Sequence, residues 1–202
     1  MKIFCVGRNY HEHAEELNNP VPDYPLIFMK PSTALLVNNK PLYYPTFTKD
    51  LQYEAEIVLK ICKNGRHVLP AFASSYYDQI AFGIDFTARD IQNKLKEEGH
   101  PWELAKAFDN SAALSAFIPM EEMKSKTIHF YLEKNEEVVQ NGNTADLIFP
   151  FNYLITYLSQ YFRLQEGDLI YTGTPAGVGP VAINDTLTGF IENRELLVCE
   201  IK

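Results

Sequence analysis

The sequence predicts a mainly β fold of the α+β class, with a few peripheral helices, in a single domain spanning residues 1–202. Strand-like segments outnumber helical ones, and prolines and glycines are spread along the whole chain. No linker, repeat or low-complexity tract divides the sequence. A chain of this length buries roughly 70% of the surface that its unfolded form exposes. We therefore expect one packed core.

The strands are predicted from apolar runs and from alternation. Segment 53–61 gives the clearest signal, because apolar residues occupy its odd positions, the period of a strand with one buried face. Segments 127–133 and 137–140 are separated by a short turn and are expected to form a hairpin. The other expected strands are 2–6, 26–29, 80–86, 168–172, 186–192 and 195–201.

Three helices are expected. Residues 88–98 carry apolar side chains four apart, and Gly99 stands where a helix commonly ends. Residues 151–162 follow a proline and also show helical spacing. Residues 11–17 are long enough for about two turns.

Composition excludes several functions. The chain has 26 acidic and 18 basic residues and a net charge of −8, which argues against a nucleic-acid or anionic-membrane partner. Its three cysteines are scattered, so neither a disulfide framework nor a zinc site is indicated. The apolar start is too short for a signal peptide, and no run reaches the ~18 apolar residues of a membrane span. A cytoplasmic protein is expected.

Three acids form the first candidate site. Glu54 and Glu56 are two apart on a predicted strand and therefore share one face. They mark either a solvent-exposed face or an oxygen-ligand site for Mg²⁺ or Mn²⁺. Asp85 ends an apolar segment, where a bare carboxylate is costly to bury and a shared metal would remove that cost. Alternatively, Asp85 caps the helix that follows.

Other polar residues stand in suggestive positions. Arg89 and Gln92 are three apart on a predicted helix and are neighbours on its surface. Lys106 lies in an apolar, aromatic segment, either as a surface lysine or as a cation that holds an anionic substrate. His13 and Glu16 are also three apart, which suits an exposed charged helix or an oriented general base. The Gly/Pro-rich segment 167–180 is by itself a turn.

The order of these motifs is more informative than any one of them. Along the chain they read Gly-Arg-Asn-Tyr, His-x-x-Glu, Phe-x-Lys-Pro-Ser, Glu-x-Glu, Asp-x-Thr-Ala-Arg-Asp-x-Gln, Lys-x-Phe-Asp and Gly-Asp-x-Ile-x-Thr-Gly-Thr-Pro-x-Gly-Val-Gly. This series resembles the fumarylacetoacetate hydrolase family, and is most similar to its short acylpyruvase and oxaloacetate decarboxylase branch. The matches run from about Val6 to Pro180.

The resemblance implies a twisted β roll, usually dimeric, with its active site in a cleft. It also assigns roles by position. The metal ligands would be Glu54, Glu56 and Asp85, holding Mg²⁺ or Mn²⁺, with Ca²⁺ as a possible substitute in crystals. The catalytic residues would be His13 and Glu16, a dyad on a lid segment, with Lys106. The substrate contacts would be Arg89, Gln92, Thr174 and, in a matching segment, Lys30.

The activity implied first is metal-dependent hydrolysis of a carbon–carbon bond in an acylpyruvate, through a pyruvate enolate stabilised by the metal. Two alternatives stay open. The same site would serve an oxaloacetate decarboxylase or a 2-oxo diacid isomerase or tautomerase, since these reactions share the enolate. A catalytically silent metal- or metabolite-binding member is the third interpretation. In each case the partners expected are a small 2-oxo acid and a second copy of the chain.

Overall fold

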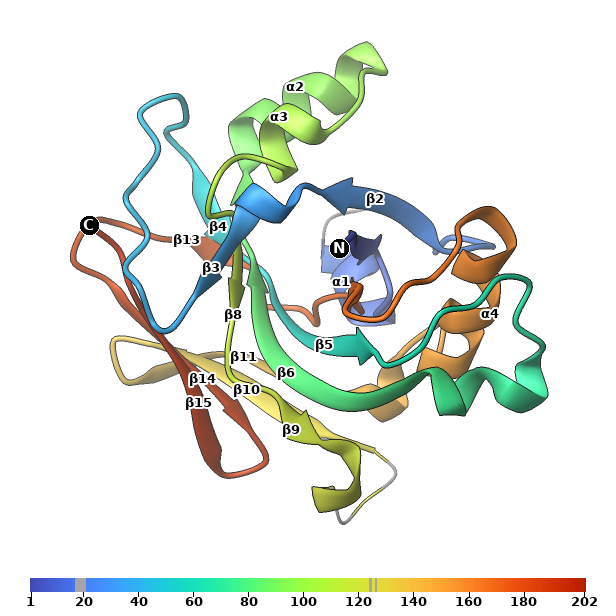
Figure 1. Ribbon diagram of the computed structural model, residues 1–202. Coiled ribbons are helices and arrows are strands. Elements are labelled where there is room, and N and C mark those ends of the chain that lie inside the picture. Colours follow the sequence, from blue (N-terminus) through green and yellow to red (C-terminus); the bar gives the residue numbers. More distant parts are fainter. Residues whose placement is uncertain (17–20, 124, 126) are drawn as a thin grey trace.

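The structure, a computed structural model, describes residues 1–16, 21–123, 125 and 127–202, without the side chains of residues 13–15. Its largest element is a strongly curved sheet of eight strands, ordered β2-β1-β12-β5-β6-β8-β3 with β9 paired to β6 (Figure 1). These strands are β1 Ile3–Gly7, β2 Leu26–Lys30, β3 Leu35–Val37, β5 Ala55–Ile61, β6 Tyr77–Asp85, β8 Ala112–Leu114, β9 Ile118–Pro119 and β12 Leu169–Tyr171.

Two smaller sheets complete the roll. An antiparallel sheet of four strands has the order β11-β10-β14-β15, and its strands are β10 His129–Lys134, β11 Glu137–Asn143, β14 Thr186–Ile191 and β15 Arg194–Glu200. A sheet of three short strands has the order β13-β4-β7, and its strands are β4 Leu51–Tyr53, β7 Thr87–Ala88 and β13 Gly179–Pro180.

The helices lie at the edges of the sheets. They are α1 His11–Glu16, α2 Arg89–Glu98, α3 Glu103–Lys106 and α4 Phe151–Tyr161. Short 3₁₀ turns occur at Ser32–Ala34, Pro70–Tyr76, Met120–Glu122 and Thr144–Asp146. Helices α2 and α3 lie together near β2, apart from α4 (Figure 1). Within the part of the chain that is described, no helix is long and apolar enough to cross a bilayer.

The main hydrophobic core lies between the curved sheet and the four-stranded sheet. Phe82 of β6 and Phe130 of β10 belong to it, and their rings meet edge to face at 6.3 Å between centroids. A second, smaller cluster covers the opposite face of the curved sheet and includes Cys5, Val58 and Tyr171. Alternate residues of one strand therefore face different clusters, which is why the sheet is buried on both sides.

The predicted fold class is confirmed, and so are most of its long elements. Helix α2 ends before Gly99, which has a left-handed backbone (φ 68°). The N–H of Gly99 donates to the carbonyls of Leu95 and Lys96. The hairpin is formed by β10 and β11 around Asn135 and Glu136, both with positive φ. Of the predicted helix 11–17, residues 11–16 form α1, and residue 17 lies outside the described residues.

One predicted strand was wrong in its extent. Segment 53–61 is not continuous, because Tyr53 ends β4 in the small sheet and Ala55 begins β5 in the large one. Glu54 stands at the junction, where its carbonyl accepts a hydrogen bond of 2.8 Å from the N–H of Asp85. The alternation of apolar residues continues through the junction, so it did not reveal the change of sheet.

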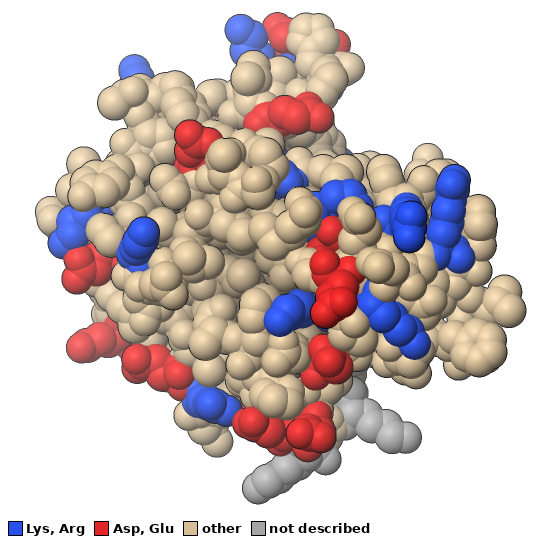
Figure 2. Space-filling model, in the orientation of Figure 1, with Lys and Arg blue, Asp and Glu red and all other residues tan. Residues whose placement is uncertain are grey.

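The face of the molecule shown in Figure 2 has no large patch of one charge. Acidic and basic side chains are scattered there among a larger uncharged area. The concentration of charge that matters lies inside the molecule.

Candidate metal centre and active site

The three predicted acids converge in a buried pocket. Glu56 lies on β5, Asp85 ends the neighbouring β6, and Glu54 stands at the bend before β5. One carboxylate oxygen from each lies within 4.8 Å of the other two. Their residues are only 6%, 2% and 1% exposed for Glu54, Glu56 and Asp85, respectively. Three carboxylates this close and this buried need a cation among them.

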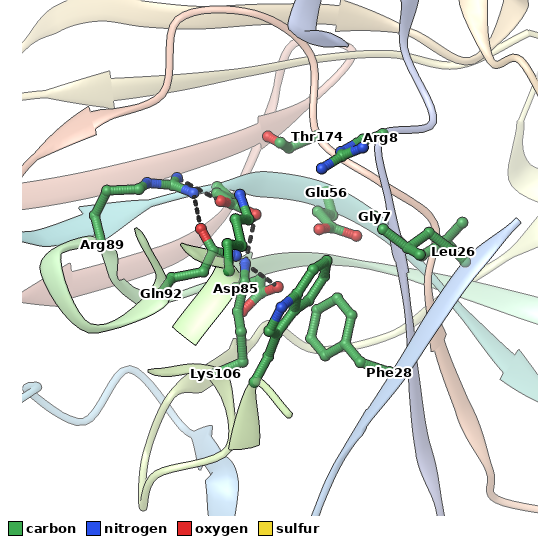
Figure 3. A pocket seen from close by; sticks show the side chains of 14 residues that line it. Gly7, Arg8, Leu26, Phe28, Glu56, Asp85, Arg89, Gln92, Lys106 and Thr174 are labelled. Carbon is green, nitrogen blue, oxygen red and sulfur yellow. Dashed lines mark hydrogen bonds and ion pairs between the residues drawn. The ribbon is translucent and has the colours of Figure 1, made fainter. Parts of the chain in front are cut away.

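Lys106 supplies part of that positive charge. Its Nζ donates to Glu54 Oε2 at 2.8 Å and to Asp85 Oδ2 at 2.9 Å, so one ammonium bridges two of the acids (Figure 3). Burial by itself lowers the pKa of this lysine, but the charges of Asp85 and Glu54 outweigh burial and raise the pKa above its ordinary value. Lys106 is therefore a fixed cation at neutral pH.

Glu56 is the acid without a cationic partner among the interactions of the described residues. It accepts a 2.6 Å hydrogen bond from the backbone N–H of Gly173. Burial raises the pKa of Glu56 well above its ordinary value, and the negative charge of Asp85 raises it further. Its ionised form is therefore unfavourable unless a positive charge enters the pocket.

Asp85 is held from behind by a second buried lysine. Lys30 Nζ lies 2.7 Å from Asp85 Oδ1, and it also donates to the Ser111 hydroxyl and to the carbonyls of Ser111 and Lys106. The Lys30–Asp85 contact is an ion pair without hydrogen-bond geometry, which leaves Oδ1 with no hydrogen-bond donor among the described residues. Lys30 does not line the pocket itself.

The donor set fits a hard divalent cation. Three carboxylates offer the oxygen ligands that Mg²⁺ and Mn²⁺ prefer. Among the described residues, Glu56 has no ion pair with a cationic side chain and Asp85 Oδ1 has no hydrogen bond, so each would gain by coordinating a metal. Glu54, Glu56 and Asp85 are the residues that would hold such an ion, as the sequence predicts.

Arg89 and Gln92 lie on the first turn of α2, at one side of the acids (Figure 3). Arg89 donates to Glu54 Oε1 at 2.6 Å, to Gln92 Oε1 at 2.6 Å and to Gln52 Oε1 at 2.8 Å. The guanidinium thereby fixes the carboxylate of Glu54 and turns the amide of Gln92 toward the same pocket. The structure brings both predicted residues to the site.

Thr174 enters the pocket from the loop that follows β12. Its hydroxyl accepts a hydrogen bond of 2.9 Å from Gln140, whose side chain also bonds to the Ala55 N–H and the Pro175 carbonyl. Gln140 belongs to β11 in the four-stranded sheet, and it connects the loop that carries Thr174 to the start of β5. No pattern in the sequence singled out Gln140, because its role depends on contact between two sheets.

The predicted dyad is seen only in part. Both residues belong to α1, but the side chain of His13 lies outside the described residues. The carboxylate of Glu16 accepts from the backbone N–H of Gly177 at 3.1 and 3.2 Å. Helix α1 is thus joined to the same Gly-rich loop that carries Thr174. The pairing of His13 with Glu16 stays a prediction.

The rest of the pocket was not predicted. It is a small cleft, partly open to solvent, and its walls include Leu26, Phe28 and Trp102. Two further cations, Arg8 and Lys96, also line it. Arg8 belongs to the Gly-Arg-Asn-Tyr motif, which was the one available signal for it, whereas Lys96 is an ordinary charged residue in the last turn of α2.

Comparison with known proteins identifies the family of the chain. The family described as fumarylacetoacetate (FAA) hydrolase C-terminal matches residues 2–202. The chain is 42% identical over 186 residues to a Bos taurus protein named oxaloacetate tautomerase FAHD1, mitochondrial, covering 92% of this chain and 84% of the relative. It is 39% identical over 197 residues to oxaloacetate tautomerase YcgM of Escherichia coli (strain K12), covering 96% and 90%.

A solved structure extends the likeness to three dimensions. The crystal structure of fumarylpyruvate hydrolase from Pseudomonas aeruginosa, in complex with Mn²⁺ and pyruvate, has a TM-score of 0.94 and 34% sequence identity. The similarity covers 100% of this chain and 89% of that one. Sequence and structure therefore agree along the whole chain, which belongs to the fumarylacetoacetate hydrolase family as an enzyme of its short acylpyruvase and oxaloacetate decarboxylase-like branch.

Proposed function

We propose that this enzyme interconverts the keto and enol forms of oxaloacetate with the help of a divalent metal ion. The observation that carries the proposal is the convergence of three buried carboxylates within 4.8 Å, with the Lys106 ammonium bridging two of them. The two relatives described above, both named oxaloacetate tautomerases, favour this reaction over the hydrolysis expected first from the sequence.

When bound by Glu54, Glu56 and Asp85, a Mg²⁺ or Mn²⁺ ion would supply Lewis-acid polarisation of the 2-oxo group. The chain's own groups would do the rest. Tautomerisation moves one proton from the carbon next to the carbonyl to the carbonyl oxygen, so no atom is gained or lost. The site must therefore stabilise negative charge on that oxygen and exchange one proton with the carbon.

Lys106 suits the first task. Its raised pKa keeps it charged, and a fixed ammonium beside the developing enolate stabilises it without reorganisation. The amide of Gln92 is held toward the pocket by Arg89. Thr174 accepts from Gln140, and its own proton has no acceptor among the described residues, so it is available to a substrate oxygen.

His13, oriented by Glu16, is the proposed base for the second task. The bond from Gly177 to Glu16 holds α1 against the loop that carries Thr174. The predicted homodimer and cytoplasmic location also stay predictions.

Hydrolysis of an acylpyruvate is the second candidate. The fumarylpyruvate hydrolase at 34% identity favours it, because cleavage of such a substrate passes through the same type of enolate. It differs in requiring an activated water molecule, which His13 would generate. Product analysis separates the two candidates, since only hydrolysis of acetylpyruvate releases acetate.

The test is stopped-flow ultraviolet absorbance of enol oxaloacetate as it converts to the keto form, with the protein plus Mn²⁺ and with EDTA. A blank with Mn²⁺ alone corrects for catalysis by the free ion. We expect a metal-dependent rate well above that blank, reduced on the order of 10²- to 10³-fold by Lys106→Met. The matched control Lys94→Met, on exposed α2 surface, should leave the rate unchanged. A wild-type rate equal to the blank would contradict the proposal.

A further inference from the structure

The pocket contains more positive charge than its carboxylates use. Four cationic side chains line it, Arg8, Arg89, Lys96 and Lys106, against three acids. Arg89 and Lys106 are paired with Glu54 and Asp85, as described above. Among the described residues, neither Arg8 nor Lys96 forms an ion pair or a hydrogen bond with the side chain of any acid. Arg8 and Lys96 are therefore not needed to neutralise the acids of the pocket.

Arg8 is held in a costly position. Its backbone has φ 56°, in the left-handed region that arginine seldom adopts. The next residue, Asn9, is fully buried and fixes the chain there by bonding to the carbonyls of Phe149 and Thr172 and to the N–H of Phe149. The turn aims the Arg8 side chain toward Thr174 and Glu56, on the opposite side of the pocket from Arg89 (Figure 3).

Arg8 is also partly withdrawn from water, and none of the described acids forms an ion pair with it. Burial lowers the pKa of its guanidinium. A half-buried cation on a strained backbone is unfavourable for the free protein. Such an arrangement persists where a ligand supplies the missing negative charge.

Lys96 approaches the same pocket from α2. Its Nζ lies 5.5 Å from the centroid of the Trp102 ring, which forms part of the wall. The pKa of Lys96 is lowered to about 8, first by burial and then by the positive charges of Arg89 and Arg8. Arg8 and Lys96 thus line one pocket, Arg8 from the turn after β1 and Lys96 from α2.

The geometry points to a receptor for a second carboxylate: Arg8 and Lys96 bind the distal carboxylate of a 2-oxo dicarboxylic acid whose 2-oxo acid end lies at Glu54, Glu56 and Asp85. This inference rests on the proposed function, which places the 2-oxo acid end at the acids. It adds the residues that recognise the second carboxylate, and it predicts that a dicarboxylate such as oxaloacetate binds better than a monocarboxylate of the same length.

The charges agree with that class. A divalent ion added to the pocket makes it more positive still, and a dianion offsets more of this charge than a monoanion does. Arginine is suited to a planar carboxylate, which it binds through two parallel hydrogen bonds. Lysine adds a point charge from the other side. A monocarboxylate would leave both cations without a partner, which a partly buried site disfavours.

The test is calorimetric binding to the Mn²⁺-loaded protein of two ligands, difluorooxaloacetate and pyruvate. The first is a dicarboxylate that cannot enolise, and the second has the 2-oxo acid end alone. Arg8→Gln and Lys96→Gln should each raise the Kd of difluorooxaloacetate on the order of 10-fold to 100-fold. The Kd of pyruvate should not change. Lys94→Gln, on the same helix but outside this pocket, should change neither Kd.

Three results would overturn the inference: equal weakening of both ligands, no weakening of either, or wild-type protein that binds the dicarboxylate no more tightly than pyruvate. Retained pyruvate binding shows that each variant is folded and holds its metal. Failure of the proposed function would give a different result. The protein would still bind difluorooxaloacetate more tightly than pyruvate, but it would not convert oxaloacetate. Glutamine keeps the Cβ at residue 8, so the backbone strain at φ 56° is the same in the variant.

Discussion

The backbone N–H of Gly173 donates a hydrogen bond of 2.6 Å to the carboxylate of Glu56. This bond connects the loop after β12 to the one acid of the pocket that has no cationic partner among the described residues. It lowers the pKa of Glu56, but burial and the charge of Asp85 raise that pKa by more. The metal-free site is therefore a source of instability, and a cation would relieve it.

Glu56→Gln should stabilise the metal-free protein. The raised folded-state pKa means that ionised Glu56 opposes folding. This penalty is absent below the unfolded pKa of about 4.3 and grows as the pH rises toward the folded pKa. The Tm measured in EDTA should thus exceed that of the wild type by more at about pH 8 than at about pH 5. Added Mn²⁺ should raise the wild-type Tm and not that of the variant. A variant less stable than wild type at both pH values would contradict this account.

Gly173→Ala should destabilise the fold and weaken the metal site together. Its backbone has φ 106°, and an added Cβ would lie 2.6 Å from the Cβ of Asn9. The matched control is Gly167→Ala, at φ 86° with open space around the added atom. The control should lose only about 1–2 kcal/mol from backbone strain, whereas Gly173→Ala should lose about 1–3 kcal/mol more from the clash. Urea unfolding of both variants measures the difference, and equal losses would show that the Asn9 contact is unimportant.

Lys30→Met should lower the free energy of unfolding, because Lys30 supports Asp85 from behind the pocket. The methionine fills similar space but leaves Asp85 and the carbonyls of Ser111 and Lys106 without their donor. Removing one partner of a buried ion pair costs about 3–5 kcal/mol. Lys60→Met, at a partly exposed position of β5, should cost far less in the same urea experiment. Similar losses for the two variants would remove the supporting role from Lys30.

Binding of a dicarboxylate at about pH 8 should take up a fraction of a proton. The pKa of Lys96 is lowered to about 8, first by burial and then by neighbouring cations, so its free form is partly neutral there. An anion beside it raises the pKa, and the lysine then gains a proton. Calorimetry of difluorooxaloacetate binding in two buffers of different ionisation enthalpy measures the uptake, which should vanish in Lys96→Gln and decline at about pH 6. Uptake that persists in the variant would assign the proton to another group.

The acids of the site were predictable because their signals are local. The spacing of Glu54 and Glu56 and the apolar surroundings of Asp85 are properties of short segments. Lys30 lies behind Asp85 rather than in the pocket wall, and this depends on how β2 passes α3. No pattern along β2 contains that information.

The positions of Arg8 and Lys96 in the pocket could not be predicted from the sequence either. Each is an ordinary charged residue in its own segment, and only the left-handed turn at Arg8 and the orientation of α2 bring them to one pocket. The short strands β3, β7, β8, β9 and β13 and the helix α3 were also missed. They have between two and four residues each, too few to show a period.

The origin of the acids on consecutive, hydrogen-bonded strands has a consequence for how the molecule forms. Glu56 and Asp85 become neighbours as soon as β5 and β6 pair, which requires only a loop of moderate length. Arg8 and Thr174 must come from opposite ends of the chain, and contacts of that kind form late in folding. We therefore expect the metal site to form before the substrate site during folding. A bound metal ion would then stabilise the folding intermediate in which the two ends of the chain come together.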